Sequence, residues 1–270
     1  MQVIPINTTQ SKQTSFQSCF RIYPAKSVKN LNIFSRDEIR ASTNIFREDM
    51  DWFGLVKYME KHFKNKEHIN TYSLACSDGS EAYTFTISVF ENLPENIQSK
   101  FLPVQACDID KEVLNAAQSG RINLYAIEFV IPEKAYNRSI NKYFYNPSVS
   151  VMIKGDDISE TDTISSYQPI QKLKDSVKFK HADILTELNN LKDSGNSVVM
   201  CRNVFPYLNS KYTDQVINSA RKNLKQGSLF ITGDYDENVN IRQKLLANGF
   251  TQPLFDSKFG NGANNVFLRR

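Results

Sequence analysis

The sequence is poor in the residues that hold metal ions and nucleotide phosphates. It has three histidines and four cysteines in 270 residues, and no two of Cys19, Cys76, Cys107 and Cys201 have Cys-x-x-Cys spacing. A zinc site is therefore disfavoured, and we predict no metal. The ten glycines include no G-x-G-x-x-G run, which disfavours a site for a pyrophosphate-bearing dinucleotide.

Long apolar runs are also missing. No stretch approaches the ~20 residues that cross a bilayer, and Met1–Pro24 lacks a signal-peptide pattern. Three of the four cysteines fall at the ends of expected strands, which is typical of buried, reduced thiols. We therefore predict a cytoplasmic protein without membrane insertion.

Basic charge is concentrated at the start of the chain. The net charge is +4, and residues 1–40 carry six basic and two acidic side chains, so the remainder is balanced. A basic arm could meet an acidic protein or nucleic acid. Its composition favours a solvated, partly disordered leader over residues 1–35. Because no nucleic-acid recognition motif is present, no nucleic acid is expected as a partner.

Apolar strands alternate with amphipathic helices along the rest of the chain, which predicts an α/β fold with a mostly parallel sheet. Strands are expected near 70–76, 101–107, 177–182, 197–202, 227–233, 250–256 and 264–269. Helices are expected over 36–66, 81–92, 110–118, 210–224 and 238–248. The last two strands should be antiparallel, because a parallel crossover needs about a dozen residues. We interpret Trp52, in the first helix, as core packing.

The segment Ser197–Tyr207 is the most informative in the chain. An apolar strand breaks abruptly into Arg202 and Asn203, as a buried parallel strand does where its carboxyl end opens into a binding crevice. Burying an arginine and an asparagine in a core is costly, but at the edge of a crevice the oxygens of a ligand can accept hydrogen bonds from them. An ordinary loop with a solvated arginine is the alternative.

Two further strands end in polar residues. The first opens into a turn whose Gly79 permits a tight backbone, so that amides at the next helix start face the crevice. The second is followed by Asp108 and Asp110. In doubly wound sheets an acid at this position accepts hydrogen bonds from ribose hydroxyls. We assign the ribose to Asp108 and the helix cap to Asp110.

Four ordered segments resemble the CheR-type methyltransferases, which use S-adenosylmethionine to esterify glutamate side chains of chemotaxis receptors. The family's patterns are T-x-F-F-R-x, C-S-T-G-E-E-P-Y, D-I-D-x-x-x-L and C-R-N-V-x-I-Y. The matching segments are Thr43–Glu48, Ala75–Tyr83, Asp108–Leu114 and Cys201–Tyr207. Four matches in the family's order and spacing are far more specific than any one of them.

The resemblance implies S-adenosylmethionine as the cofactor and S-adenosylhomocysteine as its product. It places Glu81 on the methionine amino group or a ribose edge, and it places Asp183 and Ile184 beside the adenine. Asn203 and Val204 are expected near the sulfonium. The full set of expected cofactor-binding residues is Thr43, Asn44, Arg47, Ala75, Ser77, Gly79, Glu81, Asp108, Ile109, Asp183, Ile184, Arg202, Asn203 and Val204.

Arg47 and Tyr207 match the pair that the family uses to hold the methyl acceptor, and we predict them as catalytic residues. Transfer to a carboxylate is an in-line displacement by an ionised acceptor, so no general base is required. The enzyme must supply alignment, which can lower such barriers by up to roughly 7–11 kcal/mol. An arginine fork can grip the carboxylate, and a tyrosine hydroxyl can fix its approach.

We predict three parts in the chain: the leader over 1–35, a residual N-terminal helical segment over 36–66, and a methyltransferase domain over 67–270. The segment before the domain is shorter than the family's amino-terminal helical domain. Turn-rich residues 145–176 should form a small β-rich insertion on the crevice side. The family carries a β-subdomain at this place, and some members use it to dock a receptor tail.

These observations predict a Rossmann-like class I methyltransferase sheet, mostly parallel with an antiparallel last strand. The expected reaction is methyl transfer to a glutamate of a protein acceptor, a chemoreceptor or other signalling protein, by a monomer. Two alternatives stay open. Asn203 followed by Pro206 and Tyr207 is one residue longer than the N-P-P-Y lip of amine or small-molecule methyltransferases. A non-catalytic S-adenosylmethionine-binding regulatory or scaffold module is the other.

Overall fold

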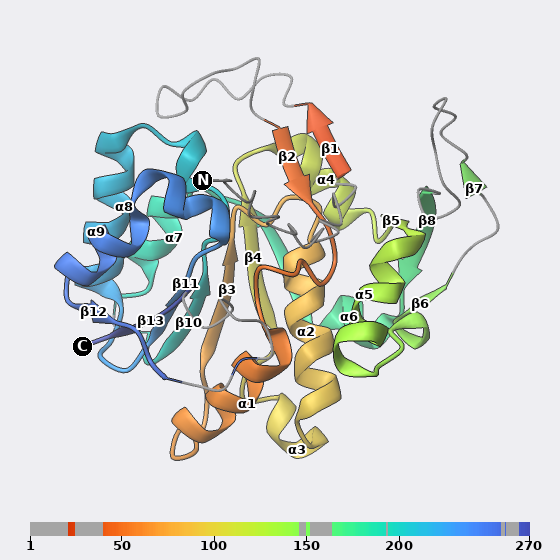
Figure 1. The fold of residues 1–270 in the computed structure, drawn as a ribbon, viewed down its shortest axis with the longest axis horizontal. Helices are drawn as coiled ribbons and strands as arrows, with labels where there is room; N and C mark the ends of the chain where they lie inside the picture. The colour runs from red at the N-terminus through yellow and green to blue at the C-terminus, as the bar shows by residue number, and fades with distance from the viewer. Residues whose placement is uncertain are drawn as a thin grey trace, which may run out of the picture.

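A seven-stranded sheet lies at the centre of the described residues in the computed structural model (Figure 1). The structure describes residues 21–24, 40–145, 150–151, 164–192, 194–254, 257 and 265–270. The sheet order is β12-β13-β11-β10-β3-β4-β9. The strands are β3 (Asn70–Leu74), β4 (Val104–Asp108), β9 (Val177–His181), β10 (Ser197–Met200), β11 (Leu229–Ile231), β12 (Phe250–Thr251) and β13 (Val266–Arg269).

The strand directions confirm the predicted fold class. Five neighbours, β11, β10, β3, β4 and β9, run parallel. Strand β13 is antiparallel to both β11 and β12, as expected for the last two strands. The chain proceeds from β3 outward to β4 and β9, then returns to β10 on the other side of β3. In α/β sheets of this kind, ligands bind at the carboxyl ends of the strands where the direction of travel reverses.

Helices cover both faces of the sheet. In Figure 1, α8 and α9 lie on one side of the strands and α2 on the other. The helices are α1 (Trp52–His62), α2 (Ser80–Asn92), α3 (Glu95–Gln98), α4 (Lys111–Gln118), α5 (Ala126–Tyr136), α6 (Gln171–Asp175), α7 (Ile184–Asn190), α8 (Ser210–Asn223) and α9 (Ile241–Ala247).

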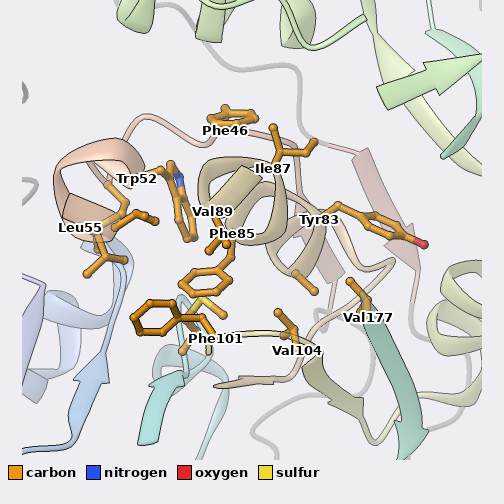
Figure 2. Close-up of a cluster of buried hydrophobic side chains, with 14 of the residues drawn as sticks. Phe46, Trp52, Leu55, Tyr83, Phe85, Ile87, Val89, Phe101, Val104 and Val177 are labelled. Carbon is orange, nitrogen blue, oxygen red and sulfur yellow. The ribbon is translucent and has the colours of Figure 1, made fainter. Parts of the chain in front are cut away.

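The side chains of β10 alternate between the two cores. Val198 and Met200 join the cluster that contains α1 and α2, whereas Val199 and Cys201 join the cluster of α7 and α8. This period of two is the geometry of a strand, and both faces are apolar because helices cover both. Figure 2 shows the first cluster, in which Phe85 of α2 lies near the sheet.

The prediction of a helix over 36–66 is wrong for its first half. Residues Arg40–Thr43 form β2, which pairs antiparallel with β1 (Arg21–Pro24). The helix α1 begins only at Trp52, because the Asp51 side chain caps it by accepting the Gly54 N–H at 2.9 Å. Strand β1 falls within the expected leader, and the rest of 1–35 lies outside the described residues.

The expected insertion is a small antiparallel sheet, but it reaches further back in the chain. Strand β8 (Ile164–Pro169) pairs with β5 (Ile122–Tyr125), β6 (Phe144–Tyr145) and β7 (Ser150–Val151). Residues 171–175 are helical, and 146–149 and 152–163 lie outside the described residues. The sequence pattern missed β5, which precedes residues 145–176 in the sequence but pairs with β8 in the folded protein. The division into domains stays a prediction.

Four helices were not expected from the sequence. Helices α3, α6 and α7 span four to seven residues, which is too short for a 3.6-residue period to be recognised. Helix α5 contains Pro132 in its interior, where proline removes a backbone hydrogen bond and normally signals a helix end. Among the described residues, no helix is long and apolar enough to cross a membrane.

Candidate functional site

The turn between β3 and α2 has an unusual backbone. Ala75 has a φ of 58°, Ser77 of 52° and Gly79 of 88°, all in the left-handed region. Non-glycine residues are strained there, and such strain persists only where the surroundings hold it. At Gly79 a β-carbon would lie 2.6 Å from Phe179 Cζ, so any other residue would require the phenylalanine ring to shift as well as a left-handed backbone. Ala75, Ser77 and Gly79, which are all predicted site residues, therefore share one tight loop at the carboxyl end of β3.

Asp108 at the end of β4 ties this loop to the next strand. Its carboxylate accepts the Ser77 N–H at 2.8 Å and the Asp110 N–H at 2.8 Å. Burial raises the pKa of Asp108, and these backbone donors oppose the rise. Asp110 caps α4 by accepting the Glu112 N–H, which confirms its predicted role. Ile109 lies between the two acids, and its carbonyl contacts His181 Nε2 at 3.0 Å.

Arg202, directly after β10, is buried among carboxylates. Only 8% of the residue is exposed, so the alternative of a solvated loop arginine is wrong. Nη1 donates to Glu81 Oε2 at 3.2 Å, and Nη2 donates to Asp49. The guanidinium also lies over the Trp52 ring, 4.6 Å from its centre. Trp52 is core packing, as expected, and at the same time a platform for this cation.

The charges of this cluster support one another. Burial would lower the pKa of Arg202, but Asp49 and Glu81 outweigh it and raise the pKa. Burial raises the pKa of Glu81, whereas Arg202 and the Ser73 hydroxyl, 2.7 Å from Oε1, hold it down. A buried charge without such a partner would cost several kcal/mol. The arginine and the two acids are therefore a single unit.

Asn203 is held from three sides. Its φ is 57°, and its backbone N–H donates to Asp236 at 2.8 Å. Its side chain donates to Asp49 at 3.1 Å and accepts the Tyr235 N–H at 3.1 Å. A β-carbon at Gly233 would lie 2.2 Å from its Oδ1, so glycine is required there. The amide is thus turned toward the end of β11, and Val204 packs against the second core cluster.

The structure places Arg47 and Tyr207 close enough to interact electrostatically. Arg47 Nε lies 3.9 Å from Asp49 Oδ2, and its guanidinium lies 5.1 Å from the centre of the Tyr235 ring. Burial lowers the pKa of Arg47, while Asp49, Tyr235 and Tyr207 raise it. Tyr207 ends a 3-10 turn (Phe205–Tyr207). Both predicted catalytic side chains are therefore within electrostatic reach of each other.

The segment before Arg47 is anchored to helices α2 and α5. The Ile45 N–H donates to Glu128 at 2.6 Å, and the Phe46 N–H donates to Thr84 at 3.0 Å. Phe46 has a φ of 51°, and this strained, buried residue redirects the chain just before Arg47. Thr43 and Asn44, also predicted for the site, are buried in the same segment.

Asp183 and Ile184 lie apart from the arginines. Asp183 caps α7 through the Leu185 N–H, and both its oxygens accept the Tyr212 hydroxyl at 2.6 and 2.7 Å. Ile184 is buried in the second core cluster. The Ala182 N–H donates to the Asp108 carbonyl at 3.1 Å. This pair therefore lies beside the end of β4, on the Asp108 side of the site.

Sequence reasoning missed five residues that complete the site. Asp49 contacts both arginines, Asp234 and Tyr235 follow β11, and Asp236 accepts three backbone N–H groups, from Gly233, Asn203 and Phe205. Asn265 donates to the Asp49 carbonyl at 3.2 Å and to Asp234 at 2.6 Å. The run Gly233–Asp236 at the end of a strand has the same polar pattern as the three segments that were recognised.

The cysteines at the strand ends do not form a reactive site. Cys76, Cys107 and Cys201 are buried and free, as predicted, and Cys19 lies outside the described residues. Burial raises the pKa of the Cys107 thiol to about 12 and that of Cys76 and Cys201 well above its usual value. A thiol with a raised pKa is a poor nucleophile at neutral pH. These three thiols are therefore not candidate nucleophiles.

Residues 41–251 match the family model of the CheR methyltransferase SAM binding domain. The chain is 25% identical to chemotaxis protein methyltransferase 2 of Vibrio cholerae over 167 residues, which are 62% of this chain and 51% of that protein. It therefore spans about half the length of that relative. It is 27% identical to a chemotaxis protein methyltransferase of Borreliella burgdorferi over 228 residues, 82% of this chain and 73% of that protein.

Among solved structures, the chain resembles magnesium protoporphyrin IX methyltransferase from Synechocystis PCC 6803, solved with bound SAM. The TM-score is 0.38 at 12% identity, over 81% of this chain and 78% of that chain.

Proposed function

Because the chain belongs to the CheR methyltransferase family, we propose that it transfers a methyl group from S-adenosylmethionine to a glutamate side chain of a protein. One observation carries this proposal. Arg47, which the family resemblance assigns to the acceptor, lies in one charged cluster with Glu81 and Arg202, which it assigns to the cofactor, and Tyr207, its proposed partner, acts electrostatically on Arg47. Asp49 joins the two sides.

The residues at the strand ends suit S-adenosylmethionine. Five buried side-chain polar atoms have no hydrogen-bond partner among the described residues, and three of them belong to predicted site residues: Asn44 Oδ1, Ser77 Oγ and Arg202 Nε. Unpaired buried groups are uncommon in proteins, and a ligand that pairs with these three atoms would satisfy them. The carboxylates of Glu81 and Asp108 retain further acceptor capacity for the amino and ribose hydroxyl groups of the cofactor. We therefore assign the cofactor to this edge of the sheet.

We assign to Arg47 and Tyr207 the alignment of the acceptor carboxylate with the methyl group. S-adenosylmethionine supplies a methyl group activated by its sulfonium. Arg47 binds the acceptor carboxylate through its fork, which keeps that carboxylate ionised and fixes its plane. The Tyr207 hydroxyl donates to one carboxylate oxygen and leaves the other to attack. No proton has to be removed, which accords with a site built of arginines, acids and a phenol.

A protein acceptor is supported by the two relatives, whose names are those of chemotaxis protein methyltransferases. A chemoreceptor or another signalling protein is the acceptor class that we propose. The small sheet of β5 to β8 is our candidate for docking it. Helix α5, which follows β5, holds the segment before Arg47 through the hydrogen bond from the Ile45 N–H to Glu128. The small sheet is thus linked to the arginine that we assign to the acceptor. A cytoplasmic location and a monomeric state remain predictions.

Methyl-label chemistry tests the proposal. The purified chain is incubated with methyl-labelled S-adenosylmethionine and a total protein extract of the source organism, and labelled proteins are then treated with mild alkali. We expect volatile labelled methanol, because carboxyl methyl esters hydrolyse in base. Alkali-stable label would indicate an amine or small-molecule methyltransferase instead. Calorimetric binding of the cofactor without any transfer would indicate a non-catalytic module.

A further inference from the structure

Asp49 has more partners in the site than any of the predicted residues. It lies in the turn between β2 and α1, and 8% of its side chain is exposed. Oδ1 accepts from Arg202, while Oδ2 accepts from Asn203 at 3.1 Å and from the Asp234 N–H at 3.4 Å. Oδ2 also lies 3.9 Å from Arg47 Nε. One carboxylate thus joins the Arg47 segment to the ends of β10 and β11.

This carboxylate allows two cations to be neighbours. The charge on Arg202 lowers the pKa of Arg47, which means that the two guanidiniums repel each other. Asp49 raises the pKa of both, so it attracts both. Without the charge on Asp49, Arg202 would keep Glu81 as its partner, but the attraction that offsets the repulsion between Arg202 and Arg47 would be lost. The placement of both arginines therefore depends on Asp49.

We propose that Asp49 is a positioning residue. It orients Arg202 and Asn203, which are assigned to the cofactor, and it holds Arg47 beside them. This inference rests on the proposed function, and it adds a residue that the predicted site did not include. The effect of Asp49 passes through the hydrogen bonds of two side chains that follow β10.

The test uses S-adenosylhomocysteine as the probe and isothermal titration calorimetry on the full chain. Asp49→Asn keeps the shape and removes the charge, and we expect it to weaken binding about tenfold or more, since charge-assisted hydrogen bonds are lost. Asp49→Glu restores the charge and should recover much of that loss. Glu48→Gln, which removes a charge from the exposed neighbour, should bind within about twofold of the wild type.

A second control separates positioning from general stability. Glu91 on α2 is also a buried carboxylate, paired with Lys142 at 2.6 Å and Arg138 at 3.6 Å, away from the strand ends. Glu91→Gln should lower the urea midpoint of unfolding but leave the affinity for S-adenosylhomocysteine unchanged. Equal losses of affinity in Glu91→Gln and Asp49→Asn would mean that Asp49 acts only through stability, and would overturn the inference.

The outcomes distinguish this inference from the proposed function. No binding by the folded wild type would overturn both. Wild-type binding with unchanged affinity in Asp49→Asn would overturn the positioning role alone. If Asp49→Asn fails to fold, the same change is made with Arg47→Ala, which removes the repelled cation. The double variant should then bind about tenfold more weakly than Arg47→Ala, and equal binding by the two would refute the role of Asp49.

Discussion

At the residue scale, charged side chains at the strand ends are buried together, so each depends on its neighbours. Arg202 keeps its charge because Asp49 and Glu81 surround it. Asn203 keeps a strained backbone because Asp236 accepts its N–H and Gly233 leaves room for its amide. A change in one such residue is therefore expected to act on binding as well as on stability.

Binding and turnover should separate at Arg47 and Tyr207. Both are assigned to the acceptor, so Arg47→Ala and Tyr207→Phe should leave the affinity for S-adenosylhomocysteine within a few-fold of the wild type while suppressing methyl transfer. Calorimetry measures the first quantity and labelled methyl incorporation the second. Loss of cofactor binding in a folded variant would show that the assigned residue belongs to the cofactor side.

Asp236 should give the protein a pH-dependent stability. Burial raises the pKa of Asp236 from 3.8 to about 6, although hydrogen bonds from the backbone N–H groups of Gly233, Asn203 and Phe205 lower it. The folded state thus holds the proton more tightly than the unfolded state. This contribution is present below pH ~4 and is lost as the pH rises through ~6, and it amounts to about 3 kcal/mol at ~1.4 kcal/mol per unit.

Urea unfolding of the wild type and Asp236→Asn between pH 4 and pH 7 measures this contribution. The difference in unfolding free energy between the two proteins should change over this range, because asparagine does not titrate. A constant difference across the range would mean that Asp236 is ionised throughout.

At the element scale, the loop from β3 to α2 carries much of the site, and its shape depends on one glycine. Ala75, Ser77 and Gly79 take left-handed conformations within five residues. A β-carbon at Gly79 would in addition lie close to the ring of Phe179 on β9. The loop is therefore restrained by the packing of β9 against β4 as well as by its own sequence.

Gly79→Ala should destabilise the protein by roughly 1–3 kcal/mol, because the new methyl group strains the backbone and collides with Phe179. The double variant with Phe179→Leu should recover the part due to collision and leave the part due to the backbone. Chemical denaturation of the wild type, Gly79→Ala and the double variant measures the part due to collision and the part due to the backbone. Full recovery in the double variant would show that the positive φ costs nothing.

At the scale of the whole molecule, the site lies where segments far apart in the described part of the sequence meet. The Arg47 segment, the ends of β3, β4, β10 and β11, and Asn265 before β13 all contribute. A ligand bound there contacts parts of the chain that separate on unfolding. Its binding free energy is then added to the stability of the fold.

S-adenosylhomocysteine at 100 times its dissociation constant should stabilise the protein by about 2.7 kcal/mol. For a chain of this length, that corresponds to a rise in Tm of roughly 5–10 °C. Differential scanning fluorimetry over a range of ligand concentrations measures the shift. Adenosine alone, which lacks the amino-acid part of the cofactor, serves as the control and should give a smaller rise at the same concentration.

The sequence by itself determined the parallel sheet and much of the candidate site, because both are written in local patterns. The polar residues after apolar runs predicted that Gly79, Asp108 and Arg202 follow strands. Strand ends are local features, and parallel strands bring their carboxyl ends to one edge. The order of the segments then identified the family, which the match over residues 41–251 confirms.

Only the tertiary structure decided which of these residues touch and which others join them. Asp49 and Arg202 are 153 positions apart, and nothing in the sequence near Asp49 indicates that its partner follows β10. Likewise, β5 joins the small sheet although it precedes the segment that looked like an insertion. Such contacts arise because sheet order and helix packing are set by burial over the whole chain, whereas a sequence pattern reports on only a few neighbours.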